Sequence, residues 1–183
     1  MNETELCKLI AACKANKRAA QELLYKYFHD YGLSICLRYT SNREDAKEVL
    51  DDGFVKVFTK VKDYPDNINF KSWFRRILIN TAIDYFRQRQ RKIEMVLLEE
   101  YHDQIIEPEY YNQLSYDQLI YFVEDLSPMY RMVFNLYEIE GLNHEEIAKM
   151  LNISEGTSRS NLTRARVKLQ VKILEYHKTI KIE

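Results

Sequence analysis

Apolar residues recur every three to four positions along most of the chain, which is the period of a helix with one buried face. Few segments alternate with a period of two, so the fold class is predicted to be all-α. In the N-terminal half the pattern predicts helices over about residues 3 to 15, 17 to 39, 42 to 61 and 69 to 92.

Residues that cap or break helices support these boundaries. Asn42 is a good N-cap ahead of two acids, and Pro65 with two asparagines predicts a loop before residue 69. Ser127 is expected to cap a helix that Pro128 opens. Further helices are predicted over residues 115 to 126, from Asn143, where Glu146 completes a capping box, and after Ser154.

Residues 93 to 113 lack a single helical period and are rich in acids, which indicates a linker. The predicted architecture is therefore two small helical domains, residues 1–92 and 114–183, joined by an acidic linker over residues 93–113. The C-terminal domain is expected to contain a helix-turn-helix.

The net charge of −1 hides a segregation of charge along the chain. Residues 93 to 130 hold nine acids and no lysine or arginine, whereas residues 71 to 92 hold seven bases and one acid. Residues 155 to 172 hold five bases and one acid. Two basic helices are thus separated by an acidic stretch.

Other chemistry is not indicated. The three cysteines, Cys7, Cys13 and Cys36, have no paired spacing, and the four histidines are scattered, so we expect reduced thiols, no metal site and no cofactor. Without an apolar run near the ~18 residues of a membrane span, the chain is expected to be soluble and cytoplasmic, with no membrane insertion. The absence of a glycine-rich phosphate loop, an HExxH motif and a nucleophile triad argues against an enzyme and a small-molecule substrate.

The stretch "NHEEIAKMLNISEGTSRSNLTRARVKL" (143–169) has the form of a helix-turn-helix. At about 100° per residue, four apolar residues fall on one side of its second helix: Leu162, Ala165, Leu169 and Ile173. Ser160, Thr163 and Arg164 fall on the opposite side with Arg159 flanking them, and these four are the candidates for base contacts. Arg166 and Lys168 are better placed for phosphates. An ordinary helix with a solvated basic face is the alternative interpretation.

The stretch "FKSWFRRILINTAIDYFRQRQRK" (70–92) carries the second concentration of bases. A narrow stripe on it holds Trp73, Arg76, Asn80, Asp84, Arg87 and Arg91. An aromatic ring beside cations suits unpaired nucleic acid, because the ring stacks on a base while the cations follow the phosphates. Taken one at a time, Trp73 could belong to the core, Asn80 could face water, and Asp84 could pair with Arg87 or Gln88.

The order of these pieces resembles the extracytoplasmic-function (ECF) group of bacterial sigma factors, over about residues 25 to 169. "NREDAKEVLDDGFVKVF" (42–58) is similar to the family's polymerase-clamp helix, and the helix from Phe70 is similar to the one for the promoter −10 element. "LSPMYRMVFNLYEIEGLNHEEIAKMLNISEGTSRSNLTRAR" (126–166) is similar to the domain for the −35 element.

The resemblance implies a sigma factor that binds core RNA polymerase, recognises the two promoter elements and assists melting. Asn80 would help to hold a flipped −10 base, aided by the loop from Tyr64 to Phe70. Arg87 would contact a phosphate of the DNA backbone. It implies a polymerase-binding set whose members would face, or support, the polymerase clamp surface: Asp45, Val49, Asp52 and Phe54. It also implies an anti-sigma factor as a partner, besides core polymerase and promoter DNA.

This sequence departs from the family pattern at several positions. Asp51 stands where glutamine is common, and Gly53 where a β-branched residue is common, at a cost of roughly 1 kcal/mol in helix propensity. Ser158 replaces a frequent valine and Asn161 a basic residue, so the −35 preference is not transferable. A helix-turn-helix regulator that is not carried by polymerase is the alternative, but it leaves residues 42–58 and the stripe from Trp73 without a role.

Overall fold

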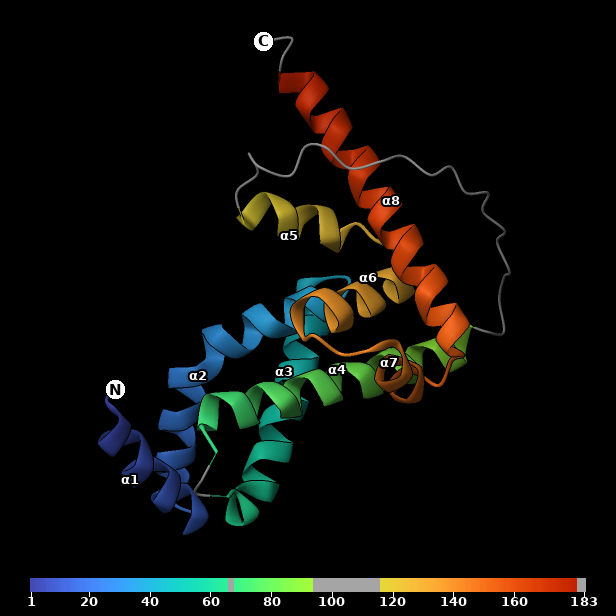
Figure 1. Cartoon of the computed structure of the whole chain (residues 1–183). Coiled ribbons are helices and arrows are strands. Elements are labelled where there is room, and N and C mark those ends of the chain that lie inside the picture. The colour runs from blue at the N-terminus through green and yellow to red at the C-terminus, as the bar shows by residue number, and fades with distance from the viewer. Residues whose placement is uncertain (66–67, 94–115, 181–183) are drawn as a thin grey trace. The chain divides into compact units, whose positions relative to one another are not determined.

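The computed structural model describes residues 1–65, 68–93 and 116–180, and these residues form helices and their connections without a strand (Figure 1). The chain divides into two compact units. The first comprises residues 1–37 and 42–85, and the second comprises residues 38–41 and 86–183. The predicted all-α class is confirmed, and each unit is described by itself.

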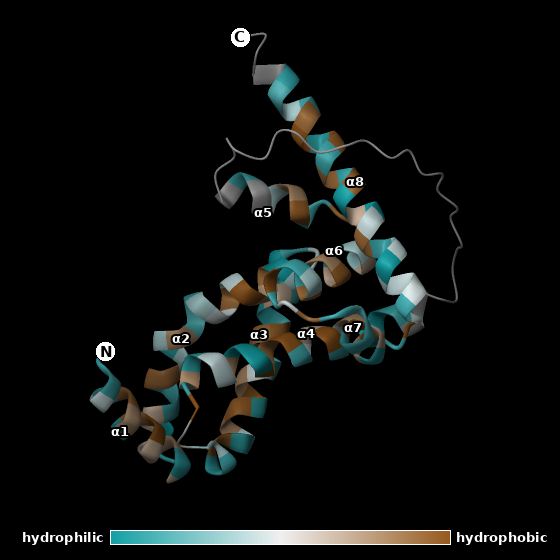
Figure 2. Cartoon of the chain, viewed as in Figure 1, coloured by the Kyte–Doolittle hydropathy of each residue, from teal (hydrophilic) through white to brown (hydrophobic). Residues whose placement is uncertain are grey.

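The first unit is built from helices at the predicted places. Its elements are α1 (Glu3–Lys14), α2 (Arg18–Tyr39), α3 (Arg43–Lys60), the 3₁₀ turn η1 (Val61–Asp63) and α4 (Phe70–Ile93), of which the last eight residues belong to the second unit. Apolar residues appear as brown bands on α3 and α4 in Figure 2. The largest fully buried side chains here include Leu24, Ile35, Leu50, Phe74 and Leu78.

Two glycines allow the helices of this unit to pack closely. A Cβ on Gly53 of α3 would lie 2.4 Å from Cδ2 of Leu78 on α4. A Cβ on Gly32 of α2 would lie 2.5 Å from Cδ1 of Leu50 on α3. Gly53 is buried, so its absent side chain serves the packing of α3 against α4 and does not alter an exposed face.

The second unit contains the predicted C-terminal helices. Its elements are α5 (Tyr116–Glu124), α6 (Pro128–Phe134), the π-helical turn η2 (Asn135–Ile139), α7 (His144–Leu151) and α8 (Glu155–Ile180). Leu162, Ala165, Leu169 and Ile173 are buried, as their spacing predicted. Three of these four pack with Phe122, Val123 and Leu126 from the α5 region.

A buried arginine joins α6 to the end of α5. The guanidinium of Arg131, 4% exposed, donates to the carbonyl oxygens of Glu124 and Leu126, the latter at 2.9 Å. Burial lowers the pKa of Arg131, and the charge of Glu124 opposes that shift. A carbonyl at the C-terminal end of α5 and one in the turn that follows thereby gain a donor.

Most predicted caps are confirmed. Asn42 accepts from the amide of Asp45, and Asn143 forms a full capping box with Glu146. Ser127 is the N-cap residue of α6 and Pro128 opens the helix, as predicted, although the Ser127 side chain makes no capping hydrogen bond. The turn η2 was not predicted. None of the described helices is long and apolar enough to cross a membrane.

Candidate nucleic-acid interface

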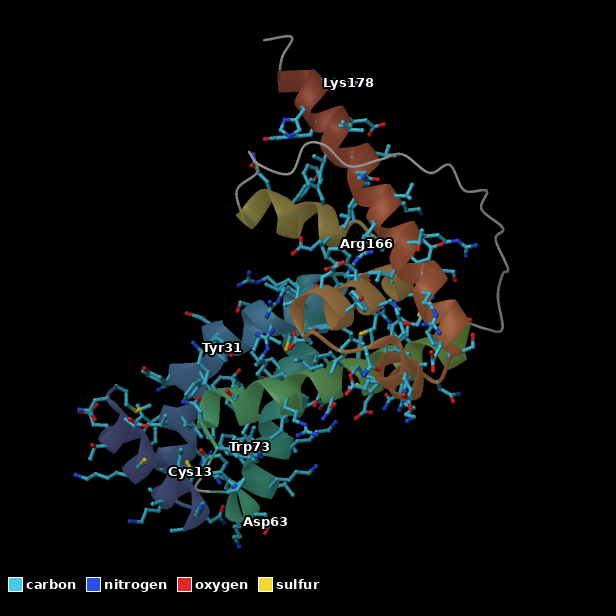
Figure 3. The ribbon with its side chains drawn as sticks, in the orientation of Figure 1. Cys13, Tyr31, Asp63, Trp73, Arg166 and Lys178 are labelled. Atoms are coloured by element: carbon cyan, nitrogen blue, oxygen red, sulfur yellow. The ribbon has the colours of Figure 1, made fainter. Side chains whose placement is uncertain are left out.

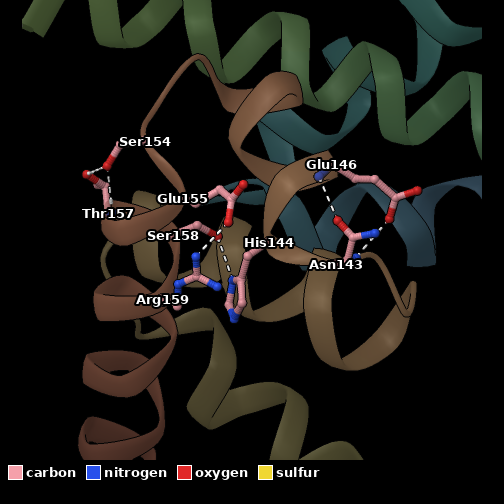
Figure 4. Close-up of polar contacts among 8 residues, drawn as sticks. All are labelled: Asn143, His144, Glu146, Ser154, Glu155, Thr157, Ser158 and Arg159. Atoms are coloured by element: carbon pink, nitrogen blue, oxygen red, sulfur yellow. Dashed lines mark hydrogen bonds and ion pairs between the residues drawn. The ribbon is translucent and has the colours of Figure 1, made fainter.

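Helices α7 and α8 form the predicted helix-turn-helix. Ile147, Ala148 and Leu151 are buried, and α7 ends at Asn152 in the left-handed region (φ 57°, ψ 46°), which asparagine tolerates better than most residues. The hydroxyl of Ser154 then accepts from the amide of Thr157 at 3.0 Å and caps α8 (Figure 4). The first three residues of α8, which follow this turn, are exposed to solvent.

The predicted base-reading residues lie on the first three turns of α8. Arg159 and Thr163 are exposed, whereas Ser160 and Arg164 are partly buried. Arg159 pairs with Glu155 at 2.6 Å, with both side chains largely in solvent. Such exposed pairs contribute little, so the guanidinium can exchange this carboxylate for a nucleic-acid acceptor. Thr157, exposed one turn before Ser160, was missed as a candidate although it precedes the arginine by only two positions.

The two residues predicted for phosphates have partners within the protein. Arg166, labelled on α8 in Figure 3, donates through Nε (2.9 Å) and Nη2 (2.6 Å) to Glu138 of η2. Its guanidinium also lies 5.7 Å from the ring centroid of Tyr137. Lys168 lies over the ring of Tyr130 at 5.2 Å. Their assignment to phosphates stays a prediction.

A histidine joins the two helices of the motif. Nδ1 of His144 lies 2.9 Å from Oγ of Ser158, and its ring stacks on Tyr137 with centroids 4.7 Å apart. Burial lowers the pKa of His144, and the charges of Arg159 and Arg166 lower it further, with Glu155 acting in the opposite sense. The side chain of His144 is half-buried.

In the first unit, α4 presents the start of the predicted aromatic and basic stripe. Arg76 and Asn80 are exposed, and Trp73 (Figure 3) is half-buried against the rings of Tyr64 and Phe70, at 5.0 and 5.7 Å. One face of the indole is thus supported by aromatic rings while part of it stays accessible. The structure thus brings two aromatic rings, of Tyr64 and Phe70, to Trp73 of the stripe.

The remaining members of the stripe differ in their surroundings. Asp84 forms an ion pair with Lys56 of α3 at 2.9 Å, and not with Arg87 as the alternative interpretation had it. Arg87 lies in the second unit, where Nη2 donates to the carbonyl oxygen of Lys149 at 3.2 Å. The side chain of Arg91 lies outside the described residues.

A cation from α1 holds the loop before α4. Nζ of Lys14 donates to the carbonyl oxygen of Tyr64 at 3.2 Å, and it lies 5.5 Å from the centroid of that ring. The hydroxyl of Tyr64 in turn donates to the carbonyl oxygen of Ile68. Helix α1 therefore supports the segment from which the aromatic rings project, a contact that sequence spacing could not reveal.

The predicted polymerase-binding set stays a prediction, and the structure shows which of its members are exposed. Asp45 is 8% exposed, and Val49 and Phe54 at most 2%, so these three can support a contact surface but cannot form it. Asp52 is exposed. The outer face of α3 contains further residues at helical spacing that the prediction missed: Glu48, Asp51 and Val55.

A metal site was not expected from the sequence. Among the described residues, no group of three His, Cys, Asp or Glu side chains is placed to hold a metal ion. The acidic linker proposed over residues 93–113 lies outside the described residues, apart from Ile93 at the end of α4.

Comparison with known proteins gives matches to both halves. The family model "Sigma-70 region 2" matches residues 24–92, and "Sigma-70, region 4" matches residues 116–169. The ECF RNA polymerase sigma factor SigE of Mycolicibacterium smegmatis is 32% identical over 142 residues, which cover 74% of this chain and 54% of that protein. This chain thus spans about half the length of that relative.

Two further proteins are similar over most of the chain. The ECF RNA polymerase sigma-E factor of Escherichia coli (strain K12) is 28% identical over 174 residues, covering 87% of this chain and 89% of the relative. A solved structure of the sigma factor RpoE with the anti-sigma factor NepR from Bartonella quintana aligns at 23% identity and a TM-score of 0.47, over 94% of this chain and 96% of that one. With region 2 and region 4 matched in order and ECF relatives aligned across them, the chain belongs to the sigma-70 family, in its ECF group.

Proposed function

We propose that this chain binds core RNA polymerase, recognises the −35 and −10 promoter elements and assists promoter melting. The observation that carries this proposal is the presence of two different cationic helices in one chain. The start of α8 presents arginines and small polar residues on a capped recognition helix, and α4 presents arginine and asparagine beside a half-exposed indole.

The −35 step belongs to α8. A recognition helix enters the major groove with its N-terminal residues at the base edges. Arg159 and Thr163 are exposed there, and Ser160 and Arg164 lie beside them. Arginine can donate two hydrogen bonds to a guanine edge, and threonine or serine can form hydrogen bonds with several different bases. The phosphate contacts assigned to Arg166 and Lys168 require these residues to leave, or share, their partners Glu138 and Tyr130.

The −10 step belongs to α4 and the loop before it. A flipped base costs a few kcal/mol of lost stacking and pairing, which the pocket must offset. Asn80 offers an amide to the base edge, Trp73 offers a stacking surface, and Arg76 offers a charge to the backbone. Capturing the base only in its flipped state drives strand opening without ATP. Arg87, Arg91 and Asp84 complete the proposed surface.

The outer face of α3 is proposed as the polymerase contact. Asp52 is its predicted centre, with Glu48, Asp51 and Val55 added because they share that exposed face. Val55 is 63% exposed, and a lone apolar residue among acids is suited to a partner that is basic around an apolar spot. Holding both DNA-reading helices on one polymerase makes their binding intramolecular, so modest contacts combine.

The other features of the proposal follow from family membership. The domains are proposed as residues 1–92 and 114–183, with residues 93–113 as a linker that occupies a basic path on polymerase. The chain is proposed to act in the cytoplasm as a transcription initiation factor without catalytic activity of its own. An anti-sigma factor is the proposed inhibitor. A regulator that binds DNA without polymerase would not co-purify with core enzyme.

The test uses holoenzyme on two templates that differ only in a premelted −10 region. Asn80→Ala should reduce transcription from the duplex promoter at least tenfold while sparing the premelted one, because base capture is needed only where strands must open. Gln88→Ala, at an exposed position of α4 outside the stripe, is the matched control and should transcribe both normally. Equal loss on both templates would refute a role of Asn80 in opening.

A further inference from the structure

The recognition helix contains a buried hydroxyl that has one side-chain partner. Ser158 is 0% exposed, although it lies between exposed Thr157 and Arg159. Its Oγ lies 2.9 Å from Nδ1 of His144, the first residue of α7 (Figure 4). A buried hydroxyl without a partner is costly, so this hydrogen bond constrains where α8 can lie against α7.

The imidazole is itself held in place. Its ring stacks on Tyr137 of η2, with an interplanar angle of 23°. Arg166 of α8 also contacts the ring of Tyr137, and it forms an ion pair with the next residue, Glu138. Two adjacent residues of the π-helical turn η2 are thus linked to α8. Tyr137 stacks on His144, which binds Ser158, and Glu138 pairs with Arg166.

We propose that His144 is a positioning residue for −35 recognition, which sets the angle of α8 by holding the hydroxyl of Ser158. This inference rests on the proposed function of α8. Ser158 immediately precedes Arg159, so a shift of Ser158 moves the first base-reading side chain with it. Base recognition needs donors placed to within tenths of an ångström, whereas phosphate contacts through long cations tolerate displacement.

The charged groups around the imidazole are Arg159, Arg166 and Glu155 from α8, with Glu138 bound to Arg166 from η2. On α7 itself, Glu145 pairs with Lys149, and both of these side chains are exposed to solvent. His144 therefore acts through its hydrogen bond and its stacking, because burial, and then the neighbouring arginines, lower its pKa and disfavour the imidazolium.

The test is a replacement series at residues 144 and 158 in the full chain bound to core polymerase. His144→Leu keeps bulk but removes the partner of Ser158, whereas His144→Asn keeps a polar atom at the δ position. His144→Leu with Ser158→Val removes both polar groups together, which is close to neutral when the shapes fit. Glu145→Gln is the control at an exposed neighbour.

The probe is a library of promoter duplexes randomised across the −35 region, bound at a temperature where melting curves show every variant folded. We expect His144→Leu to lower the preference for the selected −35 sequence over random duplex about tenfold, with binding to random duplex unchanged. His144→Asn and the double variant should restore most of that preference. A purely structural role would lower the melting temperature and leave the preference intact.

Three results would overturn the inference: an unchanged preference in His144→Leu, equal loss on selected and random duplexes, or a double variant no better than His144→Leu. If wild-type holoenzyme selects no −35 sequence at all, the proposed function of α8 fails first and the inference fails with it. A wild type that selects, beside a His144→Leu variant that selects equally well, would refute the role of His144 alone.

Discussion

Replacing Gly53 with alanine adds one methyl group at the closest approach of α3 and α4. The new Cβ would lie 2.4 Å from Cδ2 of Leu78, well inside van der Waals contact. Leu78 is fully buried, so its methyl group has no solvent to move into. The helices must separate or Leu78 must leave its rotamer.

The magnitude follows from two opposing terms. Alanine regains about 1 kcal/mol of helix propensity over glycine, whereas an extra methyl in a filled core costs roughly 1–3 kcal/mol. We expect the free energy of unfolding of the first unit to fall by about 1 kcal/mol, or ~4–8 °C in its melting midpoint. In a Leu78→Ala background the clash disappears, so the same Gly53→Ala change should be neutral or stabilising.

The assay is urea unfolding followed by tryptophan fluorescence. Trp73 is the only tryptophan and packs on Tyr64 and Phe70, so its emission reports the first unit. Gly32→Ala, where a Cβ would lie 2.5 Å from Leu50, should show the same sign. A Gly53→Ala protein as stable as wild type, or a loss that persists without the Leu78 side chain, would refute the packing argument.

Further predictions concern the charged and thiol groups. Because the pKa of His144 is lowered from its ordinary value of 6.5, the unfolded chain takes up the proton first, so stability of the second unit should fall as pH drops below about 6.5; His144→Asn should flatten this dependence in circular-dichroism melts. Glu138→Gln releases Arg166, so affinity for duplex DNA should rise a few-fold and the salt slope should steepen by about 1 in anisotropy titrations, and an unchanged slope would contradict a phosphate role. A thiol reagent should modify the exposed Cys7 at once but should react with the buried thiols of Cys13 and Cys36 only after unfolding, as followed by mass spectrometry. Burial also raises the pKa of the Cys13 thiol, and fast labelling of either buried cysteine would show that the core is open.

Local patterns predicted the helices well because their causes lie within a few residues. Asn42 and Asn143 have acids at the positions that capping requires, and the apolar side of α8 follows from spacing alone. The π-helical turn at residues 135–139 has no such local signature. Ser127 shows that a residue in the N-cap position need not bond through its side chain, here with Pro128 at the first helical position.

The candidate site was predicted less completely because it depends on contacts between elements. Spacing put Arg159 and Thr163 on the outer face of α8 but could not reveal that Glu138, 28 residues earlier, would hold Arg166. The family resemblance marked positions on α3 without saying which of them face solvent, and the structure shows that Asp45, Val49 and Phe54 are buried. The partner of Ser158 was hidden for the same reason: its histidine lies 14 residues away.

The central claim is that this chain directs polymerase to promoters through two DNA-reading helices. The most direct measurement is run-off transcription by purified core enzyme, with and without the chain, on genomic promoter fragments. The account predicts co-elution of the chain with core enzyme and transcripts with defined start sites that core alone does not make. A chain that neither binds core enzyme nor yields such transcripts would contradict it.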